Sequence, residues 1–540
     1  MKRPITNMDR RGAISTSLGG VALLALPGCI AKGGGPFPDR PSNWPDRFGD
    51  AHVHLFNAAD LPVRGFLENV VFPDYGWTPS PRTMAILDFF IVIIKNYAPT
   101  AREEMGGAAP PSSPSDYAIL LKERAETFDR SKNTLPDMPG ASGIAKGYED
   151  LGDLIGRDEK AVPDTDIIDW RRVSRLVSED NWQAARPEGL TAGQAGAWQE
   201  VVATLRWGYL LLQPRARMME RYRQFSDAGG SAVGDVVNLL VDYDGWLGDA
   251  PAPGSAMLDQ LAYWASRARS PAPNSPVVHT FAGYDPLRHA AERRDRGDDA
   301  TLFAALVREF EQGRCAGLKL YPPMGFRAIG NETITATTRG AKEAARSWGG
   351  TMASLATALD DALEVMFDTC AAKSIPLMAH AALTRAAFPG AERLAHPEHW
   401  IARIAASQGD PGTSGLRVCL AHLSLSEAGV PEAVEQLLVL NARKGGHLPR
   451  VWFDISFDDY FLGGGGPNPF TRIRDLCRAD PGRYRWFLFG SDWNMVARSP
   501  DAAGYMAAVR SAMAEAGIPA DAGERIMRTN LSDFLRGATP

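Results

Sequence analysis

The sequence predicts an α/β protein that folds as a (β/α)8 TIM barrel, with a large, mostly helical insertion between the first and second strands. From about residue 234 onward, short apolar runs alternate with longer stretches of helical pattern. This alternation favours a parallel sheet covered by helices. One more strand-like run stands far upstream, at residues 48–57, and completes the set of eight strands that closes such a barrel.

Residues 1–29 have the features of an export signal and are not expected to belong to the fold. A basic stretch opens the chain, made of Lys2, Arg3, Arg10 and Arg11. An apolar run at 13–26 follows, and the pair Arg10-Arg11 resembles a twin-arginine signal. The motif "LPGC" resembles a lipoprotein box that ends at Cys29. We therefore expect an exported, periplasmic protein, attached to the membrane through a lipidated Cys29. An ordinary cleaved signal is the alternative.

The Gly- and Pro-rich residues 30–47 predict a tether between this signal and the folded body. The first strand follows in "FGDAHVHLFN", residues 48–57. Residues 58–233 then interrupt the barrel pattern and hold two strongly helical segments, at 84–98 and 197–225. An insertion that follows a barrel strand emerges on the catalytic face. We therefore expect this one to help form or cover the pocket as a lid.

The barrel resumes at residue 234 and continues to 537. Its seven later strands are expected in the runs "VGDVVNLLVDY", "SPVVHTFAGY", "AGLKLY", "IPLMAHA", "LRVCLAHL", "RVWFDISF" and "YRWFLFGSD". Helical patterns lie between them, for example at 300–313, 352–373, 430–443 and 500–516. Strands that alternate with helices in this way are typical of βαβ units and a parallel sheet.

The overall composition is that of an ordinary globular protein of 540 residues, with 58 basic and 64 acidic side chains. No basic block follows the N-terminal segment, which argues against nucleic acid as a partner. Four cysteines lie in the barrel region, Cys315, Cys370, Cys419 and Cys477, without the spacing of a zinc site. Reduced core cysteines are the default interpretation, and a disulfide between two of them is left open.

Metal-ligand residues stand where predicted strands end. His52 and His54 are two apart on the first strand, so both point to the same side, and Asp50 shares that side and could orient them. Residues of the same kind close three later strands, namely His380, His422 and Asp492. The carboxyl ends of barrel strands surround the active site. Histidines with an aspartate suit a divalent transition metal, zinc by default.

Six motifs resemble, in order and spacing, the amidohydrolase-2 branch of the amidohydrolase superfamily: "DAHVHL", "GLKLYPP", "LMAHA", "CLAHLS", "FDIS" and "FGSDW". The resemblance covers 48–57 and 234–537 and says little about the insertion. It implies that His52, His54 and His380 bind metal, and that Asp492 is both a ligand and the general base. It also implies that His422 binds metal or contacts the substrate.

Lys319, in "GLKLY", has three interpretations. In binuclear members of the family a lysine here is carboxylated and bridges two metal ions. An uncarboxylated ammonium beside a divalent cation would be repelled, so Lys319 could instead bind a substrate carboxylate. A purely structural role is the third alternative. The expected cofactor is therefore one or two divalent ions.

Further candidates for substrate binding are His279, Arg288 and Trp493. For His279 the competing interpretation is a core histidine, and for Arg288 a surface helix cap. Asp454, in "FDIS", is interpreted as a supporting residue rather than a catalytic one. His289 is expected at the surface.

These features favour a hydrolase in which Asp492 and His422 assist a metal-activated water. The water would attack an amide, ester or lactone bond of a small molecule. A single-metal decarboxylase of the same branch is the main alternative, and a non-catalytic, lipid-anchored binding protein is the third. No oligomeric state is predicted.

Overall fold

The computed structural model describes residues 47–71, 98–106, 207–208, 210–228, 232–247, 254–269, 275–333, 344, 348–410, 412–443, 448–499 and 502–537. The predicted export signal with Cys29, nearly all of the tether and nearly all of the helical segment 84–98 lie outside these residues. Within the described residues, none of the helices is long and apolar enough to cross a bilayer.

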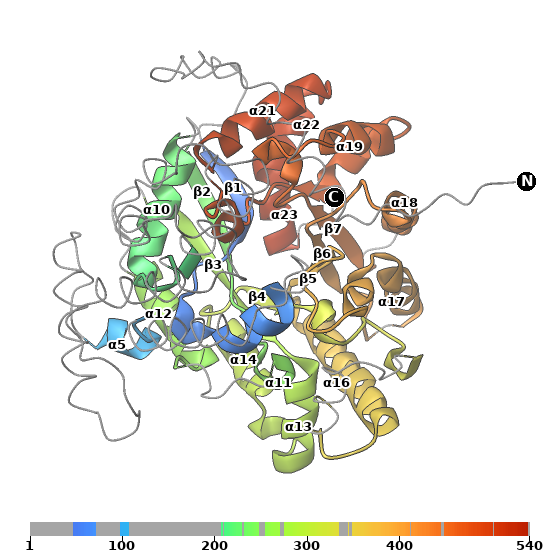
Figure 1. The fold of residues 1–540 in the computed structure, drawn as a ribbon. Coiled ribbons are helices and arrows are strands. Elements are labelled where there is room, and N and C mark those ends of the chain that lie inside the picture. Colours follow the sequence, from blue (N-terminus) through green and yellow to red (C-terminus); the bar gives the residue numbers. More distant parts are fainter. Residues whose placement is uncertain are drawn as a thin grey trace, which may run out of the picture.

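Eight parallel strands form one sheet in the order of the sequence, with helices arranged around them (Figure 1). The strands are β1 (Arg47–Val53), β2 (Ala232–Leu239), β3 (Val277–Tyr284), β4 (Gly317–Leu320), β5 (Leu377–His380), β6 (Arg417–Ala421), β7 (Arg450–Asp454) and β8 (Phe487–Leu488). Each predicted strand is present. The (β/α)8 TIM barrel is therefore confirmed.

Helices follow the strands along the chain, as the alternation predicts. After β2 come α11 (Asp244–Leu247), α12 (Met257–Arg269), α13 (Pro286–Arg296), α14 (Leu302–Glu311), α16 (Met352–Lys373), α17 (Glu398–Gly409) and α18 (Val430–Asn441). The last part holds α19 (Pro469–Cys477), α20 (Trp493–Val496), α21 (Tyr505–Glu515), α22 (Ala520–Glu524) and α23 (Asn530–Arg536).

The first strand, β1, meets the segment that follows the last strand, β8, near His52 and Asp492. The main-chain N–H of Ala51 in β1 donates to the Phe489 carbonyl at 2.9 Å, just after β8. The N–H of Asp492 donates to the His52 carbonyl at 2.7 Å. These two bonds bring the first and the last strand together.

The strands β4 to β8 are buried on both faces, which explains their continuous apolar runs. The longest covering helix, α16, begins where the Thr351 hydroxyl accepts the Ser354 N–H, a side-chain N-cap. It ends at Ser374, whose φ of +56° turns the chain back toward β5. Side-chain caps of the same kind start α13, at Asp285, and α14, at Thr301.

The described part of the insertion consists of short helices and one long one. After β1 come a 3-10 turn (Ala58–Asp60), α2 (Val63–Phe66) and a π-helical turn (Leu67–Val71), and then α5 (Ala101–Met105). The helix α10 (Arg215–Ala228) leads into β2 and confirms the helical pattern at the end of 197–225.

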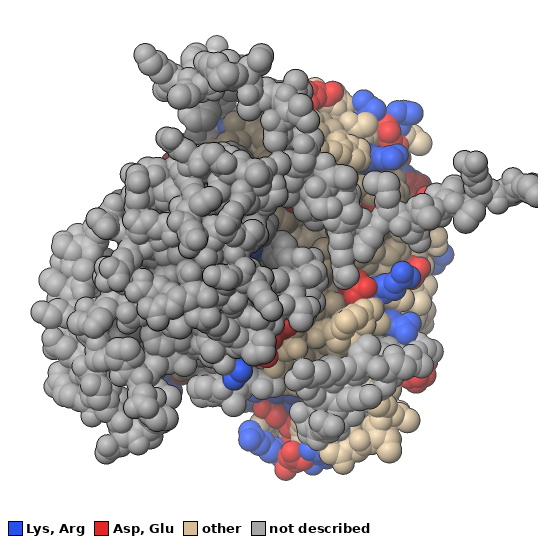
Figure 2. Space-filling view, in the orientation of Figure 1, with Lys and Arg blue, Asp and Glu red and all other residues tan. Residues whose placement is uncertain are grey.

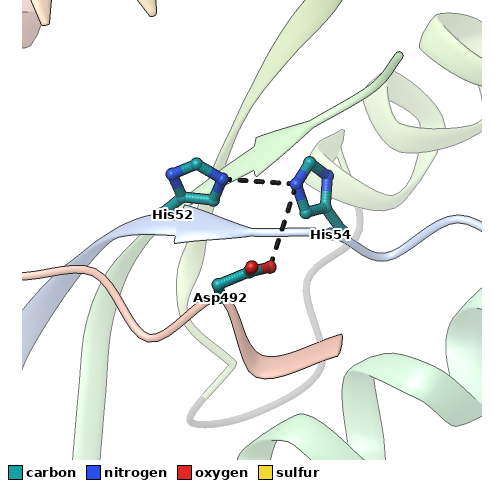
Figure 3. A group of neighbouring side chains, drawn as sticks. All are labelled: His52, His54 and Asp492. Carbon is teal, nitrogen blue, oxygen red and sulfur yellow. Dashed lines mark hydrogen bonds and ion pairs between the residues drawn. The ribbon is translucent and has the colours of Figure 1, made fainter. Parts of the chain in front are cut away.

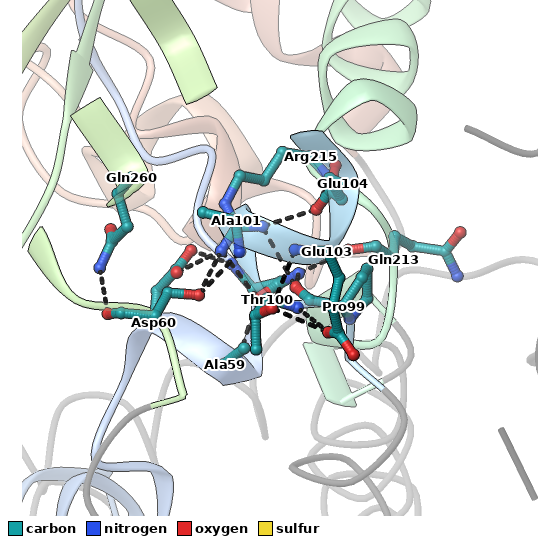
Figure 4. A network of polar contacts seen from close by, with 12 residues as sticks. Ala59, Asp60, Pro99, Thr100, Ala101, Glu103, Glu104, Gln213, Arg215 and Gln260 are labelled. Carbon is teal, nitrogen blue, oxygen red and sulfur yellow. Dashed lines mark hydrogen bonds and ion pairs between the residues drawn. The ribbon is translucent and has the colours of Figure 1, made fainter. Parts of the chain in front are cut away.

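Arg215, at the start of α10, joins these pieces to the barrel (Figure 4). Its side chain is fully buried and forms ion pairs with Asp60, in the 3-10 turn after β1, and with Glu104, in α5. It also donates to the Ser255 hydroxyl at 3.0 Å, just before α12. A buried arginine paired in this way holds three separate chain segments together.

The described surface mixes charges of both signs. Figure 2 shows Lys and Arg atoms interspersed with Asp and Glu atoms on this face.

All four described cysteines, Cys315, Cys370, Cys419 and Cys477, are buried free thiols, which agrees with the interpretation as reduced core cysteines.

Candidate metal centre

The two histidines of β1 are each held by a distant acceptor through Nδ1. His52 Nδ1 lies 2.6 Å from Asp454 Oδ2, at the end of β7. His54 Nδ1 lies 2.7 Å from the main-chain oxygen of Leu239, at the end of β2. A carbonyl oxygen can only accept, so His54 Nδ1 carries the proton and Nε2 keeps its lone pair. The Asp454 carboxylate favours the same tautomer for His52.

The two remaining ring nitrogens face each other. His52 Nε2 and His54 Nε2 are 3.2 Å apart, and Asp492 Oδ1 lies 3.9 Å from His54 Nε2 (Figure 3). One ligand atom from each residue falls within 4.8 Å of the others, and all three side chains are buried. Two lone pairs that point at each other repel unless a cation or a proton lies between them.

Burial of the two histidines favours a cation over a proton between their Nε2 atoms. Desolvation holds the pKa of His52 well below its usual value, with Lys319 the next cause, and lowers the pKa of His54 to about 3. Both imidazoles are therefore neutral, which is the form that binds metal. Asp492 Oδ1 is buried and has no hydrogen-bond partner among the described residues. The residues fit a divalent transition ion, with two nitrogen ligands and one oxygen ligand.

Burial also raises the pKa of Asp492 to about 7, while the positive charges of Lys319 and Arg385 pull it down. A bound divalent cation acts in the same direction as these two charges and favours the carboxylate. Asp492 has a left-handed backbone, with φ of +47°. Non-glycine residues in this conformation occur often at functional sites.

His422 lies next to both Asp492 and His52. Its Nδ1 is 4.0 Å from Asp492 Oδ2 and 2.9 Å from the Ser456 hydroxyl oxygen. Its ring centroid lies 4.1 Å from that of His52. Like Asp492, it has positive φ, +58°. The structure therefore brings His422 beside the three-ligand cluster, in contact with two of its members.

His380 and Lys319 lie near the cluster without belonging to it. Both are buried, and neither the ring nitrogens of His380 nor Lys319 Nζ has a hydrogen-bond partner within the described ranges. The His380 ring lies 4.8 Å from that of His422 and 4.3 Å from that of Tyr321. Burial lowers the pKa of Lys319 to about 8, although Asp454 and Asp492 act to raise it. These groups can therefore serve a substrate or a second ion.

The three substrate-binding candidates have different outcomes. Trp493 follows Asp492 and is buried against Tyr222, with ring centroids 5.8 Å apart. Arg288 binds Asp242 through two bonds of 2.7 and 2.8 Å. It lines a cavity of about 510 Å³ between α12, α13 and the insertion, rather than the three-ligand cluster.

Two expectations about histidines need correction. His279 is the third residue of β3, at the amino end of the strand, and pairs with Asp235 at 2.9 Å on the partly exposed surface. Barrel sites form at the carboxyl ends, so His279 does not reach the site. His289 is buried rather than on the surface, with Nδ1 2.8 Å from the Tyr284 hydroxyl.

Asp50 also acts differently from the expectation. It contacts the main chain around His52 and not the imidazole, which Asp454 orients instead. The register explains this, because β1 has one residue more than β2 between Asp50 and Val53. Such a bulge changes which way side chains point.

Sequence reasoning missed four residues of the site's surroundings: Ser456, Tyr222, Tyr321 and Arg385. The pKa values of His380 and His422 are lowered mainly by burial, and the nearby positive charge of Arg385, in the loop after β5, lowers them further. Ser456 could have been found, because it stands two residues after Asp454 in "FDIS". Tyr321 could also have been found, because it follows Lys319 in "GLKLYPP", whereas Tyr222 comes from the insertion and Arg385 from a loop, where no pattern marks them.

No family model and no curated protein sequence matches this chain. Two solved structures resemble it. One is a candidate 2-pyrone-4,6-dicarboxylic acid hydrolase of Acinetobacter baumannii with citric acid bound, at 12% identity over 59% of this chain and 88% of that one, with a TM-score of 0.34. The other is a candidate metal-dependent hydrolase of Lactobacillus casei, at 14% identity over 91% and 95%, with a TM-score of 0.37. Similarity at this level carries no conclusion about chemistry.

Proposed function

We propose that the protein is a metal-dependent hydrolase, in which His52, His54 and Asp492 hold one divalent ion. The substrate is a small molecule with an amide, ester or lactone bond. One observation carries the proposal: the Nε2 atoms of His52 and His54 face each other at 3.2 Å while both Nδ1 atoms are held by acceptors. Zinc is the default ion for such a site.

The chain's own residues have distinct roles in this reaction. When bound, a divalent ion polarises the scissile carbonyl and lowers the pKa of water from about 16 to about 7. Asp492, with Oδ2 toward His422, takes a proton from the attacking water and passes it to the leaving group. The Ser456 hydroxyl donates to Asp454 and accepts from His422 Nδ1, so His422 keeps a lone pair on Nε2, with which it can bind metal or accept a hydrogen bond from the substrate. Lys319 and Arg385 supply positive charge for an anionic part of the substrate.

Elemental analysis of protein purified without chelator tests the metal centre. We expect about one equivalent of metal per chain, lost in the variant His54→Ala. The matched control is His279→Ala, which removes a histidine outside the site and should keep the metal. A wild-type protein that contains no metal, and takes up none when Zn²⁺ is supplied, would overturn the proposal.

The variant Asp492→Asn tests the reaction. Against a panel of chromogenic esters, anilides and lactones, we expect turnover to fall by roughly 10²–10⁴-fold, the usual contribution of a general base. The circular dichroism spectrum should stay unchanged. Near-normal turnover in this variant would remove Asp492 from the role assigned here.

A single-metal decarboxylase is the second candidate, and one observation favours it. Lys319 lies outside the cluster of His52, His54 and Asp492, which by itself can hold one ion. In that reaction Asp492 would deliver a proton to carbon, and Lys319 would bind the carboxylate that is lost. Release of CO₂ from aromatic carboxylic acids, without hydrolysis of the chromogenic panel, would select this reaction.

Export and membrane attachment through Cys29 remain part of the proposal. The sequence features of residues 1–29 support them. The variant Cys29→Ser should move the protein from the membrane fraction to the soluble periplasmic fraction. An unchanged distribution would argue for an ordinary cleaved signal, with Cys29 incidental.

A further inference from the structure

The helix α10 of the insertion contacts the chain beneath the candidate ligands. The Tyr222 hydroxyl donates to Asp50 Oδ2 at 2.8 Å, and both side chains are fully buried. The Tyr222 ring packs edge to face against Trp493, the residue after Asp492. One tyrosine of the insertion therefore contacts both β1 and the segment after β8.

Asp50 uses its other oxygen to join these same two segments. Oδ1 accepts the main-chain N–H of His52 at 3.1 Å and that of Ser491 at 2.9 Å. His52 is a candidate ligand, and Ser491 directly precedes another, Asp492. One carboxylate thus fixes the distance between a ligand on the first strand and a ligand after the last strand.

A second contact of the insertion lies close by. Trp207 Nε1 donates to Asn494 Oδ1 at 2.7 Å, and both residues are buried. Asn494 is two residues beyond Asp492. The insertion therefore contacts both residues that follow this ligand, Trp493 through Tyr222 and Asn494 through Trp207.

We infer that Tyr222 and Asp50 are positioning residues for the metal centre, through which the insertion sets the spacing of His52 and Asp492. This inference rests on the proposed metal centre. Without the Tyr222 hydroxyl, Asp50 Oδ2 is a buried acceptor that has lost its donor. The carboxylate is then free to rotate. Rotation weakens its hydrogen bonds to the N–H groups of His52 and Ser491, which hold the two ligand segments.

Titration of the metal-free protein with Co²⁺, followed by its visible absorption, tests this inference. The variant Tyr222→Phe keeps the ring that packs on Trp493 and removes the hydroxyl. We expect a Kd for Co²⁺ roughly tenfold higher than that of the wild type, the lower end of effects from groups that orient ligands. The intensity of the absorption bands should change as well, because they report ligand geometry.

The matched control is Tyr284→Phe. Tyr284 is also buried, and its hydroxyl donates to the Ala362 carbonyl at 2.9 Å, outside the metal centre. This variant should lose similar stability with the Kd for Co²⁺ unchanged. Equal Kd values for Tyr222→Phe, Tyr284→Phe and the wild type would overturn the inference and leave the proposed function intact. A wild type that binds no Co²⁺ would overturn both.

A second pair of variants covers the case in which Tyr222→Phe does not fold. Asn at position 50 keeps one oxygen for the two main-chain N–H groups and presents an amide to Tyr222, whereas Ala removes every acceptor. We expect Asp50→Asn to bind Co²⁺ within roughly threefold of the wild type, and Asp50→Ala at least roughly tenfold more weakly. Equal weakening in the two variants would contradict a positioning role.

Discussion

Asp454 Oδ2 lies 2.6 Å from His52 Nδ1, although 402 residues separate the two in sequence. The contact joins the end of β7 to β1, two strands that both neighbour β8. Ser456 donates its main-chain N–H to Asp454 Oδ1 at 2.6 Å and its hydroxyl to Oδ2 at 3.0 Å, so the carboxylate cannot turn away. Asp454 thus fixes both the tautomer and the direction of a candidate ligand.

The variant Asp454→Asn should bind metal more weakly while the barrel persists. An amide nitrogen can face His52 Nδ1 in place of the carboxylate, and the ring then loses the acceptor that kept its lone pair on Nε2. Loss of such a partner typically costs about 10- to 100-fold in affinity. Competition with a chelating dye measures the Kd for Zn²⁺. Asp285→Asn, which removes a buried carboxylate at the start of α13, should leave that Kd unchanged.

Removal of the metal should lower thermal stability. An ion that binds only the folded protein stabilises it by about 2.7 kcal/mol when its free concentration is 100 times the Kd. We expect EDTA to lower the Tm of the wild type by several degrees and to leave that of His54→Ala unchanged. The same Tm shift in both proteins would mean that the ion lost is held elsewhere.

The buried ion pairs of Arg215 should matter more for stability than any exposed pair. The variant Arg215→Met leaves the Asp60 and Glu104 carboxylates, whose side chains are nearly fully buried, without their cationic partner, which typically costs about 3–5 kcal/mol. Urea unfolding, followed by fluorescence, measures the difference. Addition of Asp60→Asn and Glu104→Gln to this variant should recover part of the loss, since the uncompensated charges are then gone.

An exposed pair on a nearby helical segment provides the control. Arg64 and Glu68 form a bond of 2.8 Å, one turn apart, with partly exposed side chains. Pairs of this kind contribute about 0.3–0.5 kcal/mol. Arg64→Met should therefore change the free energy of unfolding very little. A loss as large as that of Arg215→Met would show that the assay responds to general charge and not to burial.

His289 should make the protein less stable in mild acid. Burial lowers the pKa of His289 to about 4, against 6.5 in the unfolded chain. As the pH falls below 6.5, the unfolded chain takes up a proton that the folded protein does not bind until about pH 4. Stability is thus lost as the pH falls, by about 2 kcal/mol between pH 7 and pH 5.

The variant His289→Gln isolates this contribution. Other groups titrate in both proteins, so the difference in free energy of unfolding between wild type and variant should shift by about 2 kcal/mol from pH 7 to pH 5, in favour of the variant. If the difference in free energy of unfolding between wild type and variant stays constant with pH, a group other than His289 takes up the proton.

The strands, and the gathering of the candidate ligands at one end of the barrel, could be predicted because both depend on local patterns. Apolar runs of strand length that alternate with helical periodicity led to the barrel, and topology alone places the ends of β1, β5, β6 and β8 at one mouth. The strand order was therefore enough to predict that five residues lie near one another: His52, His54, His380, His422 and Asp492.

The errors arose where a side chain's direction depends on more than its strand. Asp50 was expected beside the imidazoles, and a one-residue bulge turns it toward Ser491 and Tyr222 instead. His279 is on a barrel strand, but at its amino end. Tyr222 comes from the insertion, and its contact with Asp50 spans 172 residues of sequence, which no local pattern encodes.

Closure of the barrel has a consequence for how the molecule opens. Every other pair of neighbouring strands is linked by the chain that runs between them, whereas β8 and β1 stand at the two ends of the folded sequence. Separation of these two strands would turn a ring into an open sheet with two exposed edges, the template for pairing with another chain. His52 and Asp492 stand on opposite sides of this junction, so an ion held between them acts as its cross-link. In the proposed enzyme, the metal centre of His52, His54 and Asp492 would thus also protect the molecule against aggregation.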